Sequence, residues 1–550
     1  MSDLLDWRPF FPLDQPRAEQ AKAIEFVIEQ LVGKGSNYVV MELGTGVGKS
    51  AIAITLAKWA VAWHKELVEL DILGQERPKS YILTSQKILQ DQYVREFKND
   101  VSDLRSSANF SCSWLPNQTC AETMRVKDAM SNDGFDPMAL NAITCVDCNC
   151  QYKITKDSFK QADIGVTNYS YFLSETVYAG GLKPRELLIL DEAHNIEAEI
   201  RKWATITINS KLVSSLNLKV PNDDERLRKW MCSSYVVALG KLIKKQCSDI
   251  ERAILTRKYD QVKVLSRQHE ILDKHICQVN RYVKSIGGNK QDNYLIVRNY
   301  GSDVQLKPLN VTSQVRDLLF SRASKRIMMS ATILDKNVFS RSMGLPKNEH
   351  VSFISIPSPF PKQNRPIFYI PVGLMSKKHV EKTLPKLTNT IKELLALHQN
   401  EKGMIHCHTY STAQHLISTL NNKRLISHTS KDRDVALHNH LNLNEPTVLL
   451  SPSMTEGVDL KDDASRFQII CKIPYPYIGD PIIAEKMKRD PQWYPWQTAR
   501  TLLQSIGRSI RSSDDSAVTY ILDESWERFY SQNKKFFPDG FDELLISSGT

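Results

Sequence analysis

The chain lacks a long apolar run. None of its apolar stretches approaches the roughly 20 consecutive residues that a helix needs to span a bilayer. The N-terminal sequence MSDLLDWRPFFPLDQPRAEQ is acidic and interrupted by proline, which is unlike a secretory signal peptide. We therefore expect an intracellular, cytoplasmic protein with no membrane partner. Disulfides are rare in that compartment, so clustered cysteines are expected to bind metal.

Internal repeats and low-complexity tracts are also absent, which argues against a repeat protein or a disordered one. With 41% hydrophobic and 24% charged residues, the composition is that of an ordinary globular protein. A length of 550 residues is enough for three or four domains. The formal net charge of +10 fits an anionic partner but does not require one.

Short apolar, β-branched runs recur along the chain, each bounded by turn or helix-start residues. Separated by helical stretches, such runs are typical of parallel sheets covered on both faces. They form an early and a late group, so the sequence predicts two α/β domains. The runs are Asn37–Leu43, Ser80–Ser85, Glu186–Leu190, Lys325–Ser330, Gly403–Thr409, Thr447–Ser451, Phe467–Ile473 and Ala517–Leu522.

Two intervals interrupt this rhythm. Residues 101–160 carry five of the ten cysteines and show little periodicity, so their fold is expected to depend on a ligated metal. Residues 223–286 contain no proline and one glycine, Gly240, and are rich in Leu, Ile, Lys, Arg and Glu. That composition predicts an insertion of long amphipathic helices.

A phosphate-binding loop follows the first predicted strand, in the sequence MELGTGVGKS. Its glycines allow backbone N–H groups to surround phosphates at a helix N-terminus, where the helix dipole favours negative charge. Lys49 is expected to reach the β- and γ-phosphates of ATP, and the Ser50 hydroxyl to bind Mg²⁺. The residues of this loop assigned to nucleotide binding are Gly44, Thr45, Gly46, Gly48, Lys49 and Ser50.

An acidic box, Asp191–Glu192–Ala193–His194, ends a strongly apolar strand. A carboxylate at the C-terminal end of a strand suits a ligand site in an open α/β sheet. Asp191 is expected to hold Mg²⁺ through water, and Glu192 to polarise the attacking water. The tripeptide Ser330–Ala331–Thr332 follows a later strand and is a third element of the same kind.

The late half supplies further charged motifs. In QSIGRSIR, Arg508 and Arg511 stand three residues apart and would share a helical face, while Gln504 begins the motif. Arginines fit the charge that develops on a transferring phosphoryl group. Upstream, Glu456 and Asp459 follow a predicted strand, where a loop should face a cleft.

These motifs, in this order, resemble the XPD/DinG-type branch of superfamily-two DNA helicases. Arg17 and Gln20 resemble the family's adenine-reading segment, and LTSQKILQDQY at residues 83–93 its first strand-contacting motif. ADIGVTNYSYFL before the acidic box, VQLKPLN before Ser330 and SPF at residues 358–360 match in order. The resemblance covers nearly the whole chain.

The resemblance implies a fold of two RecA-like, parallel-sheet motor domains, with an iron–sulfur insertion and a helical arch both inserted in the first. It assigns residues 1–100, 161–205 and 300–345 to motor domain 1 and residues 346–550 to motor domain 2. Residues 101–160 would form the cluster domain and residues 206–299 the arch. The expected enzyme is a DNA-stimulated ATP hydrolase.

The implied activity is ATP-driven 5′→3′ translocation on single-stranded DNA with unwinding of forked duplexes in repair, replication or recombination. We expect a monomeric motor. The catalytic residues would be Lys49, Asp191, Glu192, Gln504, Arg508 and Arg511. The alternative function is an ATP-driven translocase that acts on RNA, or displaces bound protein, without unwinding DNA.

The cysteines by themselves leave the metal open, because four thiolates serve zinc and iron–sulfur clusters alike. The resemblance favours a [4Fe–4S] cluster, with zinc as the alternative. LRSSANFSC and CQYK resemble the family's first and last ligand segments, which makes Cys112 and Cys150 the outer ligands. Cys120 is the expected second ligand and Cys145 the third, with Cys148 as the alternative to Cys145.

Two positions depart from the family pattern. Tyr169 stands where a histidine is often found, and no arginine follows Asp523 closely. Both are expected to lie away from the ATP chemistry.

For DNA contact, a basic groove with aromatic stacking platforms is needed. The candidates are Thr84, Gln90, Gln92, Arg105, Phe110, Trp114, Tyr152, Lys153, Lys241, Lys244 and Lys245.

Overall fold

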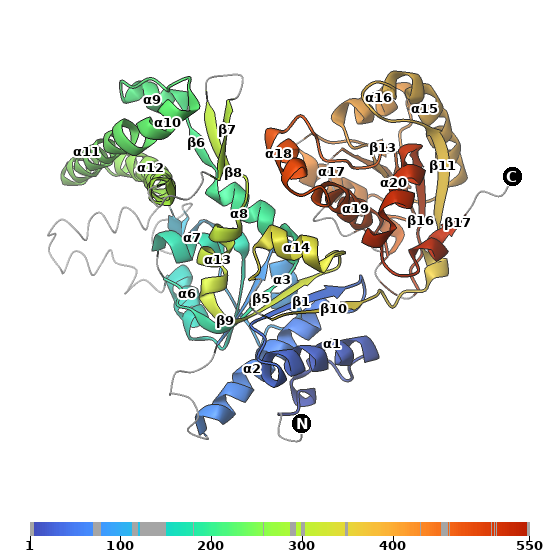
Figure 1. Ribbon diagram of the computed structural model, residues 1–550, viewed down its shortest axis with the longest axis horizontal. Coiled ribbons are helices and arrows are strands. Elements are labelled where there is room, and N and C mark those ends of the chain that lie inside the picture. The colour runs from blue at the N-terminus through green and yellow to red at the C-terminus, as the bar shows by residue number, and fades with distance from the viewer. Residues whose placement is uncertain are drawn as a thin grey trace.

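The structure is a computed structural model of the 550-residue chain. It describes residues 5–69, 79–112, 119–121, 150–179, 181–256, 258–286, 293–298, 303–346, 350–429, 431–452, 460, 462–507, 509–510, 512 and 514–546. Figure 1 shows two α/β units side by side and a third, mainly helical unit. Among the described helices, none is long and apolar enough to cross a membrane.

The first unit is built on a seven-stranded sheet of order β10-β1-β9-β5-β2-β4-β3, in which every pairing is parallel. Parallel strands need crossover connections, and helices supply them here. The strands are β1 (Tyr38–Leu43), β2 (Ser80–Thr84), β3 (Ser102–Asp103), β4 (Ile164–Asn168), β5 (Arg185–Leu190), β9 (Ala323–Ser330) and β10 (Val351–Ile356).

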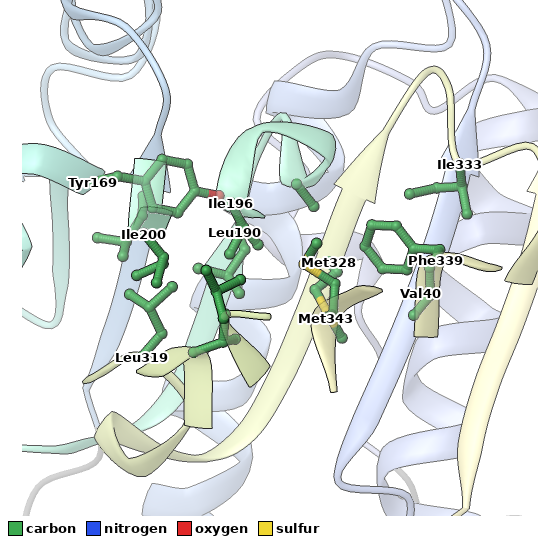
Figure 2. Packing of buried hydrophobic residues seen from close by; sticks show 14 of the residues in the cluster. Val40, Tyr169, Leu190, Ile196, Ile200, Leu319, Met328, Ile333, Phe339 and Met343 are labelled. Atoms are coloured by element: carbon green, nitrogen blue, oxygen red, sulfur yellow. The ribbon is translucent and has the colours of Figure 1, made fainter. Parts of the chain in front are cut away.

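Helices cover both faces of this sheet. Along β1, Val39 and Met41 pack against one helical layer, while Val40 faces the other. Figure 2 shows this second layer, in which Phe339 and Met343 pack beside the strands. The first layer contains α1 (Ala18–Ile28), α2 (Lys49–Glu69) and α3 (Lys87–Glu96); the second contains α7 (Tyr169–Ser174), α8 (Ile196–Ala204), α13 (Thr312–Leu318) and α14 (Lys336–Met343). Helix α6 (Gln151–Gln161) leads into β4.

The second unit has a seven-stranded parallel sheet of order β13-β14-β12-β15-β16-β11-β17. Its strands are β11 (Ile367–Gly373), β12 (Gly403–His406), β13 (Leu425–Ile426), β14 (Val448–Ser451), β15 (Phe467–Ile470), β16 (Val518–Asp523) and β17 (Leu545–Ile546). Its helices are α15 (Val380–Leu397), α16 (Tyr410–Leu420), α17 (Arg433–Asn442), α18 (Pro481–Arg489), α19 (Trp493–Ile506) and α20 (Ser525–Asn533). The predicted α/β class with two parallel-sheet units is confirmed.

The third unit combines helices with a small antiparallel sheet of order β6-β8-β7. Its long helices α11 and α12 pack against each other and project away from both large sheets (Figure 1). The predicted long helices are therefore present. The elements are β6 (Ile206–Ile208), α9 (Ser210–Ser215), α10 (Asp224–Trp230), α11 (Val236–Leu255), α12 (Tyr259–Ile286), β7 (Tyr294–Arg298) and β8 (Val304–Pro308).

Two expected domain boundaries need correction. Strand β8, which we placed in motor domain 1, pairs with β6 and β7 and so belongs to the arch unit. Strand β10, which we placed in motor domain 2, pairs in parallel with β1 at the edge of the first sheet. The chain therefore leaves the first sheet after Ile356 and enters the second at Ile367.

Candidate functional site

The phosphate-binding loop connects β1 to α2, as predicted, and its glycines are required by close packing. A Cβ atom on Gly44 would lie 2.3 Å from the backbone nitrogen of Ser358. Gly46 has φ +91°, and a Cβ there would lie 2.1 Å from the ring of Phe360. Larger residues would thus collide with the segment that links the two large sheets.

Arg17 and Gln20 lie against the same loop. The Arg17 guanidinium donates from Nη2 to the carbonyl oxygen of Val47 at 3.1 Å. The Gln20 side chain receives the backbone N–H of Arg17 at 2.9 Å and lies next to Gly48. The start of α1 therefore forms one wall of the loop, where a purine base beside the phosphates could be contacted.

The acidic box lies at the carboxyl end of β5, opposite the loop. Lys49 Nζ is 3.2 Å from Glu192 Oε1, and both side chains are largely buried. Burial acts to raise the pKa of Glu192, but the Lys49 ammonium and His194 outweigh burial and hold that pKa below its ordinary value. Burial, helped by the neighbouring Glu192 charge, raises the pKa of Asp191 to about 6.

Hydrogen bonds hold Asp191 both at its carboxylate and at its main chain, where its N–H donates to the carbonyl oxygen of Leu83 at 2.8 Å. Its Oδ1 accepts from the backbone N–H of Glu192 at 2.9 Å, and its Oδ2 accepts from the Tyr93 hydroxyl at 3.1 Å. Its carbonyl oxygen accepts from the Tyr169 hydroxyl at 2.9 Å. Our expectation that Tyr169 lies away from the ATP chemistry was therefore wrong, because the longer tyrosine side chain reaches the backbone of the acidic box.

The donor set at this position fits a hard divalent cation. The Ser50 hydroxyl and the Asp191 carboxylate supply oxygen ligands, the kind that Mg²⁺ prefers, and both are neighbours of the Tyr93 hydroxyl. Mg²⁺ usually retains water and is bound through one or two carboxylates together with substrate phosphates. One buried carboxylate beside a phosphate-binding loop meets that requirement.

A chain of polar contacts leads from the acidic box to the second large sheet. His194 Nδ1 lies 2.8 Å from Ser330 Oγ, and Gln504 Nε2 donates to Thr332 Oγ1 at 3.0 Å. Arg500 donates from Nη1 to the carbonyl oxygen of His194 at 3.2 Å. Helix α19 therefore contacts the acidic box and the tripeptide at the end of β9 directly.

A buried ion cluster joins the two units near the same place. Glu197, one turn after the acidic box on α8, contacts Lys486 of α18 and Arg201 of its own helix. Lys486 Nζ also lies 3.9 Å from the ring centroid of Trp493. On the surface, Arg341 pairs with Asp490 through two hydrogen bonds of 2.9 and 3.2 Å. Sequence reasoning did not find these contacts.

Two of the expected metal-binding cysteines converge. Cys120 is buried, and its Sγ lies 3.7 Å from the Sγ of Cys150, which precedes α6. Cys112 follows Ser111, which bridges to Thr119 just before Cys120. The described cysteines thus fit part of an all-thiolate site, although the described part of the chain contains no group of three metal-binding side chains. Cys145 and Cys148 lie outside the described residues.

Several other predicted site residues also lie outside the described residues. They are Trp114, Glu456, Asp459, Arg508 and Arg511.

The structure removes several candidates for DNA contact. Thr84 and Gln90 are fully buried, and Gln90 binds the carbonyl oxygen of Leu104. Tyr152 is buried against Phe110, with its hydroxyl 2.8 Å from that of Tyr171. These side chains serve the core. The remaining candidates are accessible: Gln92 and Arg105, whose charge is paired with Asp91 and Asp103, and the exposed Lys153, Lys241, Lys244 and Lys245.

Comparison with known proteins identifies the family. A DEAD_2 family profile matches residues 72–213, and a helicase C-terminal domain profile matches residues 391–542. Together they cover more than half of the chain.

Similar proteins extend over nearly the full length. The chain is 23% identical to a probable ATP-dependent helicase of Methanocaldococcus jannaschii, with 98% of this chain and 96% of the relative covered. It is 22% identical to the ATP-dependent DNA helicase YoaA of Escherichia coli, covering 94% and 92%. Its fold matches a solved XPD helicase over 97% of this chain and all of that one, with a TM-score of 0.61 at 15% identity. With the phosphate loop, the acidic box and two parallel sheets in place, the chain belongs to the XPD/DinG-like family of superfamily-two ATP-dependent helicases.

Proposed function

We propose that this protein is an intracellular, monomeric DNA helicase that hydrolyses ATP to move 5′→3′ along single-stranded DNA and unwinds forked duplexes in repair, replication or recombination. The observation that carries the proposal is the contact across the two large sheets. Lys49 and Glu192 face each other on the first, while Gln504 of the second reaches Thr332. A nucleotide bound at the loop would influence both sheets at once.

The residues of the site divide the work of hydrolysis. Arg17 and Gln20 would contact the base, and the glycine loop would surround the phosphates. Lys49 would neutralise the transferring phosphoryl group, and its departure from Glu192 would leave that carboxylate free to orient water. Asp191 and Ser50 would hold Mg²⁺, which supplies charge neutralisation on the phosphates. Arg508, Arg511, Glu456 and Asp459 would complete the site from the second unit.

The cysteines would hold a [4Fe–4S] cluster, with Cys112, Cys120, Cys145 and Cys150 as ligands and Cys148 as the alternative to Cys145. The 3.7 Å approach of two thiols, from segments 30 residues apart, supports a shared ligand site. Soft thiolates select iron–sulfur clusters or zinc, and zinc is the competing assignment. The site would fix the otherwise aperiodic segment to α6.

The proposal is tested by nucleic-acid preference and polarity together. We expect single-stranded DNA to stimulate ATP hydrolysis more than single-stranded RNA does, and unwinding of a duplex with a 5′ tail but not one with a 3′ tail. Stimulation by RNA alone, or stimulation by DNA without unwinding of any tailed duplex, would instead establish the translocase alternative. Metal analysis of anaerobically purified protein is expected to find about four irons per chain. One zinc per chain would refute the cluster.

A further inference from the structure

Tyr93 occupies an unusual place for a tyrosine. It lies within α3 and is only 1% exposed, with its ring in the apolar core that α3 shares with α1, α2 and the strands of the first sheet. Its hydroxyl leaves this apolar layer and donates to Asp191 Oδ2 at 3.1 Å. The Ser50 side chain is the second polar neighbour of the same hydroxyl. One phenol group thus donates to one oxygen ligand of the proposed magnesium site and is a neighbour of the other.

The hydrogen bond from Tyr93 limits rotation of the Asp191 carboxylate. A carboxylate has about four lone-pair directions. The backbone N–H of Glu192 binds Oδ1, and Tyr93 binds Oδ2, so each oxygen has one fixed partner and a remaining lone pair. The Tyr169 hydroxyl holds the backbone of the same residue. The carboxylate is therefore fixed at both oxygens and at its main chain before any cation arrives.

Packing of the core alone does not require the hydroxyl of Tyr93. The ring of Tyr93 packs among apolar side chains, and phenylalanine would fill the same volume. Outer groups that orient a metal ligand commonly change metal affinity when they are lost. If the hydroxyl of Tyr93 had only a structural role, its removal would change the free energy of unfolding. It would leave the Mg²⁺ concentration that the protein requires unchanged.

We propose that Tyr93 is a positioning residue of the magnesium site, whose hydroxyl holds Asp191 in the orientation in which Asp191 and Ser50 receive the cation that accompanies ATP. This inference rests on the proposed function. In this proposal Tyr93 acts through Asp191, the residue to which its hydroxyl donates.

The test compares Tyr93→Phe with Tyr81→Phe. Tyr81 is a matched control, because it is 2% exposed in the same sheet unit and donates its hydroxyl at 2.8 Å to the carbonyl oxygen of Lys183, outside the site. The loss of one hydrogen bond of about 0.5–1.5 kcal/mol corresponds to roughly a twofold to tenfold change in an equilibrium constant. We expect Tyr93→Phe to raise the half-saturating Mg²⁺ concentration by this factor, and Tyr81→Phe to leave it unchanged.

Two readouts are measured. The first is the Mg²⁺ dependence of ATP hydrolysis, in which turnover at saturating Mg²⁺ should fall less than affinity for the cation. The second is Mg²⁺-dependent binding of a fluorescent ATP analogue, which needs no turnover. Identical Mg²⁺ dependence in Tyr93→Phe and the wild-type protein would overturn the inference, as would an equal shift in Tyr81→Phe.

A double-mutant cycle of Tyr93 and Asp191 gives an independent test of the inference. In an Asp191→Asn background, Tyr93→Phe should change analogue binding no further, because the partner of its hydroxyl has lost its negative charge. Additive effects would overturn the inference. Absence of ATP hydrolysis in the wild-type protein would instead remove the proposed function, so the two failures are distinct.

Discussion

Lys49 Nζ and Glu192 Oε1 lie 3.2 Å apart, so the lysine of the phosphate loop forms an ion pair with the carboxylate of the acidic box. The His194 side chain contacts the other oxygen of the same carboxylate at 3.2 Å. Two groups expected to act on ATP therefore hold each other in place.

Replacement of Lys49 and replacement of Glu192 should each stop ATP hydrolysis, but for different reasons. Lys49→Ala removes the cation that faces the phosphates and is expected to reduce ATP hydrolysis by about 10²-fold or more. Glu192→Gln keeps the shape of the box and should retain nucleotide binding while losing turnover. Analogue binding and ATP hydrolysis, measured on both variants, separate the two effects. Strong DNA-stimulated hydrolysis by Lys49→Ala would contradict the assignment of the site.

The buried cluster of Glu197 and Lys486 should dominate the attachment of the second unit to α8. Replacing one member leaves an uncompensated buried charge, so Glu197→Gln and Lys486→Met are each expected to cost about 3–5 kcal/mol of unfolding free energy. The double variant should cost much less than the sum. Urea unfolding of the four proteins tests this, and simple additivity would show that the two side chains are independent.

The same cluster predicts acid sensitivity. Burial alone would raise the pKa of Glu197, but Lys486 and Arg201 outweigh it and lower the pKa to about 2. The folded pKa lies below the ordinary value of 4.5, so the unfolded chain binds more protons between these values. The contribution of Glu197 is thus complete above pH 4.5 and is lost as pH falls toward 2.

For Lys486, burial outweighs its partners and lowers the pKa from 10.5 to about 8, so well below pH 8 this side chain is protonated in the folded and unfolded chains alike and adds no pH dependence in the acid range. Urea unfolding at several pH values should show the wild-type advantage over Glu197→Gln shrinking below pH 4.5. An advantage that stayed constant to pH 3 would contradict the assignment.

The cysteine site can be separated from ordinary buried thiols. Cys120→Ser should lose most of the bound iron, because its Sγ lies beside that of Cys150. Cys407→Ser is the matched control, since Cys407 is also buried but lies in the core of the second sheet. Iron and sulfide per chain are the measurements. Equal iron content in both variants would exclude Cys120 as a ligand.

Gly46 should tolerate no side chain. Its φ of +91° disfavours any other residue, and a Cβ would lie 2.1 Å from the Phe360 ring. Gly46→Ala is expected to weaken binding of an ATP analogue at least tenfold, and the added change Phe360→Ala should restore part of it by removing the clash. Gly35→Ala is the control, because Gly35 also has positive φ but has no atom within 4 Å of a Cβ. Unaltered binding by Gly46→Ala would show that the loop is not packed in this way.

The eight predicted strands are all present, because each is an apolar run long enough to be buried on both faces. The edge strand β10, with its sequence VSFISI, was missed because an edge strand is only partly buried and carries polar residues. That omission displaced the expected domain boundary. The phosphate loop and acidic box could be predicted because their spacing is local.

The contacts of Tyr93 and Glu197 could not be predicted from spacing. In the sequence Tyr93 is indistinguishable from other core aromatic residues. Its hydrogen bond to Asp191 joins residues 98 positions apart. Glu197 reads as a charge on an amphipathic helix, and its partner Lys486 is 289 positions away. Tyr152 shows the converse, since an aromatic residue beside the cysteines looks suited to stacking on DNA and is in fact core.

The link between the two large sheets, residues 357–366, crosses the phosphate loop, with Ser358 Oγ donating to the carbonyl oxygen of Thr45 at 2.7 Å and Phe360 lying over Gly46. The segment that connects the two units is therefore also a wall of the phosphate loop. A rotation of one unit against the other would displace this segment, so the relative orientation of the units and the shape of the phosphate loop are coupled through residues 357–366.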